Sequence, residues 1–305
     1  MLPNLINKRY QRDKEYLSSY ALEKGLEVYV TDAQNDDNKQ IEQAEELFEK
    51  HVKVLIISSV NKNTAGVIVR HAHTHNVKVI AYDRIITNCD LDCFYSFDNI
   101  KVGELMAQYA LKLKPEGNYY LMGGDMGDQN AIWVKQGQMN ILEPQIKSGK
   151  IKLVYNSFVE DWSADNANFE LKRYIRLTGL TPDAIITSSD GLSVGITKVF
   201  KEMGTDQAHF PIITGQNANP DACRNILNGT QSMTVYKPIK QFARKAVDLS
   251  LQLIKDNKLT TNKTVYNGYI QVPSILFDVT LVDATNLRTT VVADGYLTEE
   301  DLKTQ

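Results

Sequence analysis

Several features that would assign the chain to a simple class of protein are scarce or missing. It has three cysteines in 305 residues, too few for a disulfide framework. No apolar run approaches the ~18–20 residues that cross a bilayer, and residues 1–4 lack the basic and apolar parts of a signal peptide. The 37 acidic and 34 basic side chains give a formal net charge of −3, which offers no basic footprint for nucleic acid. These absences leave two interpretations of the compartment open, a cytoplasmic protein or an exported protein in mature or trimmed form.

Signatures of catalysis and metal binding are also weak. No H-E-x-x-H or C-x-x-C pattern occurs. The glycine-rich residues 123–127 match neither a phosphate loop nor a dinucleotide fingerprint, and favour a close backbone approach or a tight turn. His71 and His75 stand one helical turn apart, which suits a metal ion, but a helix C-terminus also favours histidine through its dipole. We expect no enzyme activity, no metal site and no cofactor.

What the sequence does have is a regular alternation of strand-like and helix-like segments. In the first third, apolar runs rich in β-branched residues alternate with helical patterns. The predicted strands cover residues 26–31, 52–58 and 77–82, and the predicted helices cover 7–23, 36–50 and 63–75. Such alternation predicts a parallel, doubly wound sheet with right-handed crossovers.

A second set of alternating segments follows a polar excursion at residues 88–93 and a short strand at 94–97. Its predicted strands cover 118–122, 151–157, 184–187, 211–215 and 231–235. Its predicted helices cover 102–113, 131–148, 165–178, 193–203, 220–227 and 239–256. Two such sets predict an α/β protein with two similar lobes and a ligand site in a cleft between them.

The start of the first set is unusual. A doubly wound lobe normally opens on a central strand, whereas this chain opens on the loop and helix that follow one. Either the sequence is trimmed, or that strand comes from elsewhere.

Asp83 and Arg84 are the strongest candidates for ligand-binding residues, because they directly follow the strand at 77–82. Ligands of open α/β folds bind beyond the carboxyl ends of the strands. A carboxylate accepts two hydroxyl protons and a guanidinium donates a rigid fork of N–H groups, a combination that fits vicinal sugar hydroxyls. The alternative is a surface ion pair at a strand end.

Polar and aromatic residues recur at the other strand ends. Planar polar groups beside Trp and Tyr are typical of carbohydrate sites, where aromatic faces stack on the C–H face of a pyranose. Taken singly, each is more often a helix cap or a turn residue, and Asp190 and Pro220 in particular have the character of helix-start residues. The candidates are Asn4, Lys8, Arg9, Tyr10, Asp128, Gln129, Asn130, Trp133, Lys135, Glu160, Asp161, Trp162, Ser188, Ser189, Asp190, Gly215, Gln216, Asn217, Tyr236 and Lys237.

Four longer blocks together resemble the type I periplasmic sugar-binding proteins, and within that family the D-xylose-binding proteins. The blocks are residues 81–84 (AYDR), 96–105 (SFDNIKVGEL), 117–124 (GNYYLMGG) and 229–238 (GTQSMTVYKP). The similarity runs from about Asn4 to Leu302. It implies two Rossmann-like lobes joined by three hinge crossings near 97–99, 235–238 and 269–274. The N-terminal lobe would comprise residues 1–98 plus 238–272, and the C-terminal lobe 99–237 plus 273–305.

The resemblance also implies a set of sugar-binding residues. Arg9, Asp83, Arg84, Asn130, Trp162 and Lys237 match the family pattern, and Tyr10 stands where the family has Trp. Ser189 replaces an Asn and Asn217 replaces an Asp. Losing that carboxylate removes a charge-assisted hydrogen bond worth roughly 1.5–3 kcal/mol, which bears on affinity and on preference among pentoses.

The function implied is that of a non-catalytic extracytoplasmic receptor for a pentose, with D-xylose first. It would close on the sugar and signal to a membrane partner, either an ABC permease or a sensor histidine kinase. Family members begin with an export signal or lipid anchor and then the first strand, so the sequence looks trimmed and its first lobe is expected to be less stable. One alternative is the effector domain of a LacI-type transcriptional regulator, which needs a helix-turn-helix and a basic surface. The other is a sugar-processing enzyme, which needs a paired acid and base.

Overall fold

The structure, a computed structural model, describes residues 1–6, 8–261 and 263–303, and the chain forms two compact units. Unit 1 comprises residues 1–97 and 238–277, and unit 2 comprises 98–237 and 278–305. Asn7, the expected start of the first helix, lies outside the described residues, as do the last two residues of the second predicted lobe. Each unit is described by itself. That they act as two lobes stays a prediction.

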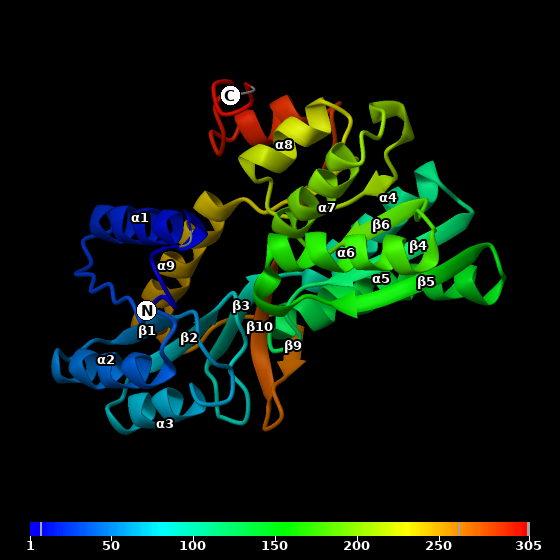
Figure 1. Cartoon of the computed structure of the whole chain (residues 1–305). Coiled ribbons are helices and arrows are strands. Elements are labelled where there is room, and N and C mark those ends of the chain that lie inside the picture. Colours follow the sequence, from blue (N-terminus) through cyan, green and yellow to red (C-terminus); the bar gives the residue numbers. More distant parts are fainter. Residues whose placement is uncertain (7, 262, 304–305) are drawn as a thin grey trace. The chain divides into compact units, whose positions relative to one another are not determined.

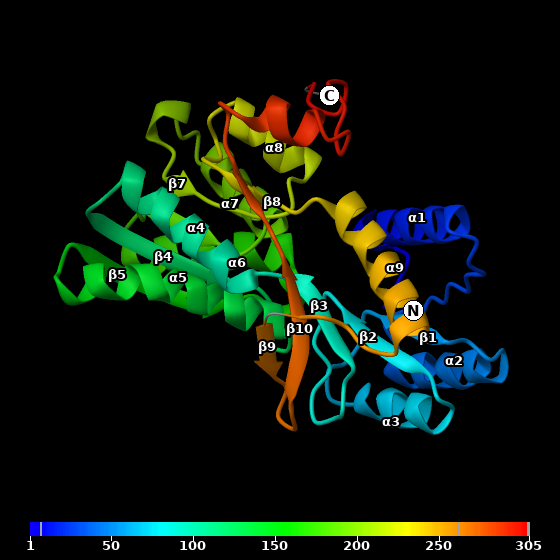
Figure 2. The ribbon, with the colours of Figure 1, turned by 180° about the vertical axis from the view of Figure 1, so that it is seen from behind.

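Unit 1 is built on a five-stranded sheet in the order β1-β2-β3-β10-β9, in which only the β10–β9 pair is antiparallel. Helices α1 and α9 pack together on one side of the sheet, and α2 and α3 on the other (Figures 1 and 2). The elements are α1 (Lys8–Glu23), α2 (Asp37–Glu49), β1 (Val54–Ile57), α3 (Gly66–Thr74), β2 (Lys78–Tyr82), β3 (Cys93–Phe97), α9 (Ile239–Asp256), β9 (Lys263–Tyr266) and β10 (Gln271–Phe277).

An aromatic cluster lies beneath the ends of β2 and β3. The Phe242 ring of α9 stacks on Tyr95 with 4.3 Å between ring centroids, and on Phe97 with 4.1 Å. Tyr82 packs against the same ring at 4.7 Å, and all four side chains are essentially inaccessible to solvent. Buried aromatic side chains contribute large apolar areas. Packing of these rings on Phe242 therefore fixes the position of the carboxyl ends of β2 and β3 relative to α9.

The predicted strand at residues 26–31 does not form. An isolated bridge between Leu2 and Asp32 lies just after the segment, and the Leu2 N–H donates to Thr31 O at 3.1 Å. A cavity of about 320 Å³ separates residues 26–30 from residues 52–56 of the β1 region. Met1 lines this cavity and donates its terminal amine to Ile56 O at 2.7 Å. A strand needs a hydrogen-bonded neighbour, and over most of its length this segment faces the cavity instead.

Unit 2 contains a parallel sheet in the order β5-β4-β6-β7 and a short antiparallel pair of β11 with β8. Helices α4 and α5 pack together, as do α6 and α7. The elements are α4 (Asn99–Leu113), β4 (Gly117–Gly123), α5 (Gln129–Lys147), β5 (Ile151–Phe158), the 3₁₀ turn η1 (Glu160–Trp162), α6 (Ala164–Thr178), β6 (Ala184–Thr187), α7 (Asp190–Glu202), η2 (Gln207–His209), β7 (Ile212–Ile213), α8 (Pro220–Leu227), β8 (Thr234–Tyr236), β11 (Thr280–Val282) and the π-helical turn η3 (Arg288–Val292).

Strand β4 shows why the sheet of unit 2 has helices on both faces. Tyr119 and Leu121 belong to the apolar cluster that includes α4 and α5 residues, whereas Tyr120 and Met122 belong to the cluster of α6 and α7. Successive strand side chains point to opposite faces, and all four are inaccessible to solvent. A strand buried on both sides is typical of parallel α/β sheets, so the predicted α/β class with parallel sheets is confirmed.

The last part of the chain departs most from the expected elements. Strands β9, β10 and β11 were not predicted, and the predicted crossing after residue 272 falls inside β10, which pairs in parallel with β3 in unit 1. The N-termini of two helices agree with prediction, since α7 begins at Asp190 and α8 at Pro220. None of the described helices combines the length and the apolar character needed to cross a membrane.

Candidate functional site

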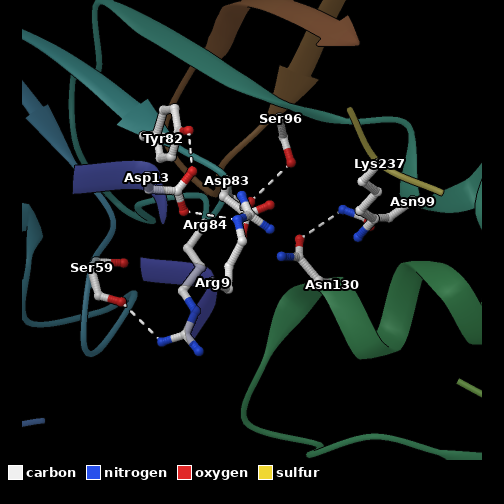
Figure 3. Close-up of polar contacts among 10 residues, drawn as sticks. All are labelled: Arg9, Asp13, Ser59, Tyr82, Asp83, Arg84, Ser96, Asn99, Asn130 and Lys237. Atoms are coloured by element: carbon white, nitrogen blue, oxygen red, sulfur yellow. Dashed lines mark hydrogen bonds and ion pairs between the residues drawn. The ribbon is translucent and has the colours of Figure 1, made fainter. Parts of the chain in front are cut away.

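The first group of candidate residues lies in unit 1 and consists of Arg9, Tyr10, Asp83 and Arg84. Asp83 directly follows β2 and adopts a left-handed backbone conformation with φ of 67°. Its N–H donates to Tyr95 O at 2.8 Å and its carbonyl accepts from the Ser96 hydroxyl at 2.9 Å (Figure 3). Left-handed geometry is uncommon outside glycine but tolerated by aspartate, and these two bonds from β3 hold it in place.

The guanidinium groups of this group are anchored differently. Arg9, in the first turn of α1, donates its Nε–H to the Asp13 carboxylate at 2.7 Å, and one of its Nη atoms lies 3.9 Å from Asp83 Oδ2. Arg84 donates to the backbone carbonyl of Ser59 at 3.2 Å. Helix α1 and the end of β2 therefore bring Arg9 and Asp83 together.

Burial and charge act against each other on these groups. Burial opposes the charge on Arg9, but the Asp13 and Asp83 carboxylates outweigh it and raise the pKa of the guanidinium. Burial raises the pKa of Asp13, and the neighbouring Arg9 counteracts part of that effect. Burial likewise raises the pKa of the Tyr10 hydroxyl. Arg9 thus carries a permanent positive charge in a site where only 19% of its side chain is exposed.

The second group lies in unit 2 and consists of Asn130, Trp162, Ser189, Asn217 and Lys237. Two of its members are joined through a residue that sequence reasoning did not select, Asn99. Lys237 Nζ donates to Asn99 Oδ1 at 3.4 Å, and Asn99 Nδ2 donates to Asn130 Oδ1 at 2.9 Å (Figure 3). All three are almost fully buried. The buried Lys237 ammonium and the two amides form a hydrogen-bonded chain, whose donors and acceptors can bind hydroxyl groups.

Trp162 is positioned by a glycine. It ends η1 with a left-handed φ of 54°, and a Cβ placed on Gly124 would lie 2.2 Å from its ring. The ring therefore packs directly against Gly124, which is the close approach expected of the glycine-rich segment. In this position the indole is half-buried and keeps part of its surface accessible.

Ser189 and Asn217 lie around a buried carboxylate, Asp190. The Ser189 hydroxyl accepts from the Leu192 N–H at 3.2 Å and so caps the N-terminus of α7, a structural role that serine often has. Asn217 has a φ of 100° and donates its N–H to Val235 O at 2.8 Å.

Asp190 ties these loops together. Its carboxylate accepts from the Asn219 N–H and the Thr234 hydroxyl, each at 2.9 Å, and from the Gln231 amide at 3.0 Å. Burial raises the pKa of Asp190 to about 7. The loop that carries Asn217 and the strand that leads to Lys237 are thus fastened to the start of α7.

The three clustered histidines do not converge on one point. The His71 ring contacts Glu45 at 2.6 Å, the His73 ring contacts Asp92 at 2.8 Å, and His75 stacks on Phe48. Among the described residues, no group of three or more His, Cys, Asp or Glu side chains has the arrangement of a metal site.

Residues 191–195 (GLSVG) have the G-x-S-x-G spacing of a hydrolase nucleophile elbow. In that elbow the serine stands exposed at a strand-to-helix turn. Here Ser193 lies inside α7 and is inaccessible to solvent, and its hydroxyl is within hydrogen-bond distance of Gln231 Oε1 at 2.6 Å and Asp190 O at 2.9 Å. Its surroundings are those of a structural serine.

Two residues were missed from the sequence, and both left a signal. Asp13 stands four residues before Leu17, so it falls on the apolar stripe of α1, where a carboxylate is out of place. Asn99 directly follows Asp98, the residue that caps α4 just after β3. A charged residue on a buried stripe and an amide at a strand-to-helix junction are both worth selecting.

Comparison with known proteins connects this geometry to a family. A family model described as a periplasmic binding protein domain matches residues 1–258. The chain is 39% identical to the D-xylose-binding periplasmic protein of Haemophilus influenzae, over 97% of this chain and 88% of that protein. It is 35% identical to the protein of the same name from Escherichia coli, over 97% and 89%.

A solved structure agrees. An ABC transporter solute binding protein from Clostridium phytofermentans, with bound β-D-glucose, superposes with a TM-score of 0.89 and 28% identity, over 99% of this chain and 98% of that one. With a family match over most of its length and relatives above 30% identity, the chain belongs to the periplasmic binding proteins, a family of solute receptors rather than enzymes.

Proposed function

We propose that the chain is an extracytoplasmic receptor for a pyranose sugar, with D-xylose as its first ligand. The observation that carries the proposal is the high identity to two proteins named for D-xylose binding, 39% and 35% along nearly the whole chain. The two groups of residues supply the chemistry such a ligand needs. One offers a carboxylate near the Arg9 guanidinium together with Arg84, and the other offers buried amides, an ammonium and an indole.

Each residue takes a role that its chemistry allows. Asp83 accepts from sugar hydroxyls, Arg9 and Arg84 donate to hydroxyl or ring oxygens, and Trp162 stacks on the C–H face of the ring. The remaining contacts come from Tyr10, Asn130, Ser189, Asn217 and Lys237. Closure of the two predicted lobes on the sugar is part of the proposal.

The choice between a pentose and a hexose depends on few atoms. D-glucose differs from D-xylose by one exocyclic CH₂OH group, and two solved structures at 28% and 26% identity hold glucose. We favour the pentose because the D-xylose-binding relatives are more similar to this chain.

Isothermal titration with D-xylose, D-glucose, D-ribose and L-arabinose tests the proposal. D-xylose should bind with the highest affinity, and D-glucose more weakly. A reversed order would leave a sugar receptor but refute the pentose preference. Absence of binding to all four sugars by a folded sample would refute the proposed ligand class.

The membrane partner is proposed to be a sugar ABC permease, because a solved structure at 28% identity is described as an ABC transporter solute binding protein. A sensor histidine kinase is the alternative partner. The relatives named as periplasmic binding proteins favour a receptor over a LacI-type regulator. Co-purification with the permease, increased by D-xylose, would support the first partner; equal recovery with and without sugar would contradict sugar-dependent signalling.

A further inference from the structure

Asp13 is a buried carboxylate that none of the expected binding residues includes. It lies on α1 with no accessible side-chain surface. One oxygen accepts from the Tyr82 hydroxyl at 2.7 Å, and the other accepts from Arg9 Nε at 2.7 Å (Figure 3). A fully buried carboxylate is costly unless it is paired and hydrogen-bonded, and here both oxygens are engaged.

The Arg9 guanidinium is held on its other sides by aromatic rings. Its central carbon lies 5.7 Å from the centroid of the Phe97 ring and 5.9 Å from that of Phe242. Both distances fall within the range of cation–π attraction. Nε is the guanidinium nitrogen next to the aliphatic stem, so its bond to Asp13 sets the plane of the group and therefore the direction of its Nη donors.

We infer that Asp13 is the positioning residue for Arg9, and that it holds the guanidinium in its sugar-binding orientation before any sugar arrives. The inference rests on the proposed function. An exposed arginine loses much rotamer freedom when it is fixed by a ligand. If the protein fixes it beforehand, that loss does not reduce the affinity for the sugar.

Asp83 cannot replace Asp13 in this role. Its carboxylate lies 3.9 Å from an Arg9 Nη atom, too far for a hydrogen bond, whereas the Asp13 contact at 2.7 Å is direct. Asp83 therefore attracts the charge without setting its orientation, and its own carboxylate is assigned to the sugar. Asp13 thus orients the Arg9 guanidinium, and Asp83 accepts hydrogen bonds from the sugar.

A double-mutant cycle tests the inference. Asp13→Asn keeps the size of the side chain but removes its negative charge and leaves one acceptor oxygen for two donors, Arg9 Nε–H and the Tyr82 hydroxyl. We expect it to weaken D-xylose binding about tenfold in the wild-type background and less than twofold in an Arg9→Ala background. An equal loss in both backgrounds would overturn the inference, because Asp13 would then act independently of Arg9.

Tyr82→Phe is the matched control. It removes the other hydrogen bond to Asp13 from an equally buried position and leaves the Arg9 contact in place. The dissociation constant of the Tyr82→Phe variant for D-xylose should stay within twofold of the wild-type value. A loss equal to that of Asp13→Asn would overturn the inference, because the carboxylate would then serve the packing of the interior in general.

A measurement on the wild-type protein covers the case in which Asp13→Asn does not fold. In ¹⁵N-labelled protein without sugar, the Arg9 Nε–H resonance should exchange slowly with water and shift little when D-xylose is added. A rapidly exchanging resonance in the sugar-free protein would refute pre-positioning. If the wild type binds no sugar, the proposed function fails, while this resonance still tests the orientation by itself.

Discussion

Replacing Asp83 with asparagine removes one negative charge from the unit 1 group and leaves its shape nearly unchanged. Asparagine tolerates the left-handed backbone as aspartate does, and the bonds with Tyr95 O and the Ser96 hydroxyl involve only main-chain atoms of residue 83. Arg9 keeps its direct contact with Asp13 at 2.7 Å. The substitution therefore changes the ability to accept from a ligand far more than it changes the fold.

The expected loss follows from the strength of hydrogen bonds to a charged acceptor. Such bonds contribute roughly 1.5–3 kcal/mol, and about 1.4 kcal/mol corresponds to a tenfold change in affinity. The dissociation constant for D-xylose should therefore rise by about 10- to 100-fold. The melting temperature should fall only slightly, because the loss of the 3.9 Å attraction between residue 83 and Arg9 leaves that guanidinium paired.

Titration calorimetry and thermal melting of the same samples measure both effects. Asp90→Asn is the matched control, since it removes an equal charge from an exposed residue seven positions along the chain and should leave the affinity unchanged. Unchanged affinity in Asp83→Asn would refute the assignment of this carboxylate to the sugar. A large fall in melting temperature with proportionate loss of binding would show that Asp83 serves the fold.

Three further predictions concern other parts of the chain. Trp162→Ala should weaken D-xylose binding about tenfold, and Trp162→Phe, which keeps a ring, should recover part of that loss; equal affinities of all three proteins would contradict stacking. Because burial raises the pKa of Asp190 to about 7 from an ordinary 3.8, the folded state holds this proton longer than the unfolded state. The contribution of Asp190 to the free energy of unfolding should therefore fall by about 1.4 kcal/mol per pH unit between about pH 4 and pH 7, as measured by chemical denaturation. If an Asp190→Asn variant has the same pH profile as the wild type, Asp190 makes no such contribution. Adding four alternating apolar residues before Met1 should raise the melting temperature, and four Gly and Ser residues should not; equal melting would show that the cavity does not accept a strand.

The fold was largely predictable because parallel strands buried on both faces have a strong apolar signal. β2, β4 and β6 are such strands, and the predicted segments overlap them closely. β9 and β11 are short, partly exposed strands, and the signal of exposed strands is weak. Residues 26–31 show the opposite case. Their pattern is that of a strand, but no neighbouring chain fills the cavity beside them, so local preference alone did not determine the outcome.

The candidate site was predictable only where chemistry and position coincide. Asp83 and Arg84 combine suitable side chains with a strand end, and the structure places both at the end of β2. Asp13 could have been selected for its place on the apolar stripe of α1, but its bond to Tyr82, which is 69 residues away in sequence, could not be predicted. Asn99 depends on Lys237, which is 138 residues away. Sequence identifies residues that can contact a ligand more readily than the partners that orient them.

The position of Met1 has a practical consequence for anyone who produces this protein. Its amine donates to Ile56 O, burial lowers the pKa of that amine to about 5, and Met1 lines the cavity beside β1. Residues fused in front of Met1 would begin their path inside unit 1, between residues 26–30 and 52–56. An affinity tag rich in histidine or acidic residues would bring polar groups into that apolar space. A tag at this end would therefore need an extended, apolar leader of several residues before its first polar group.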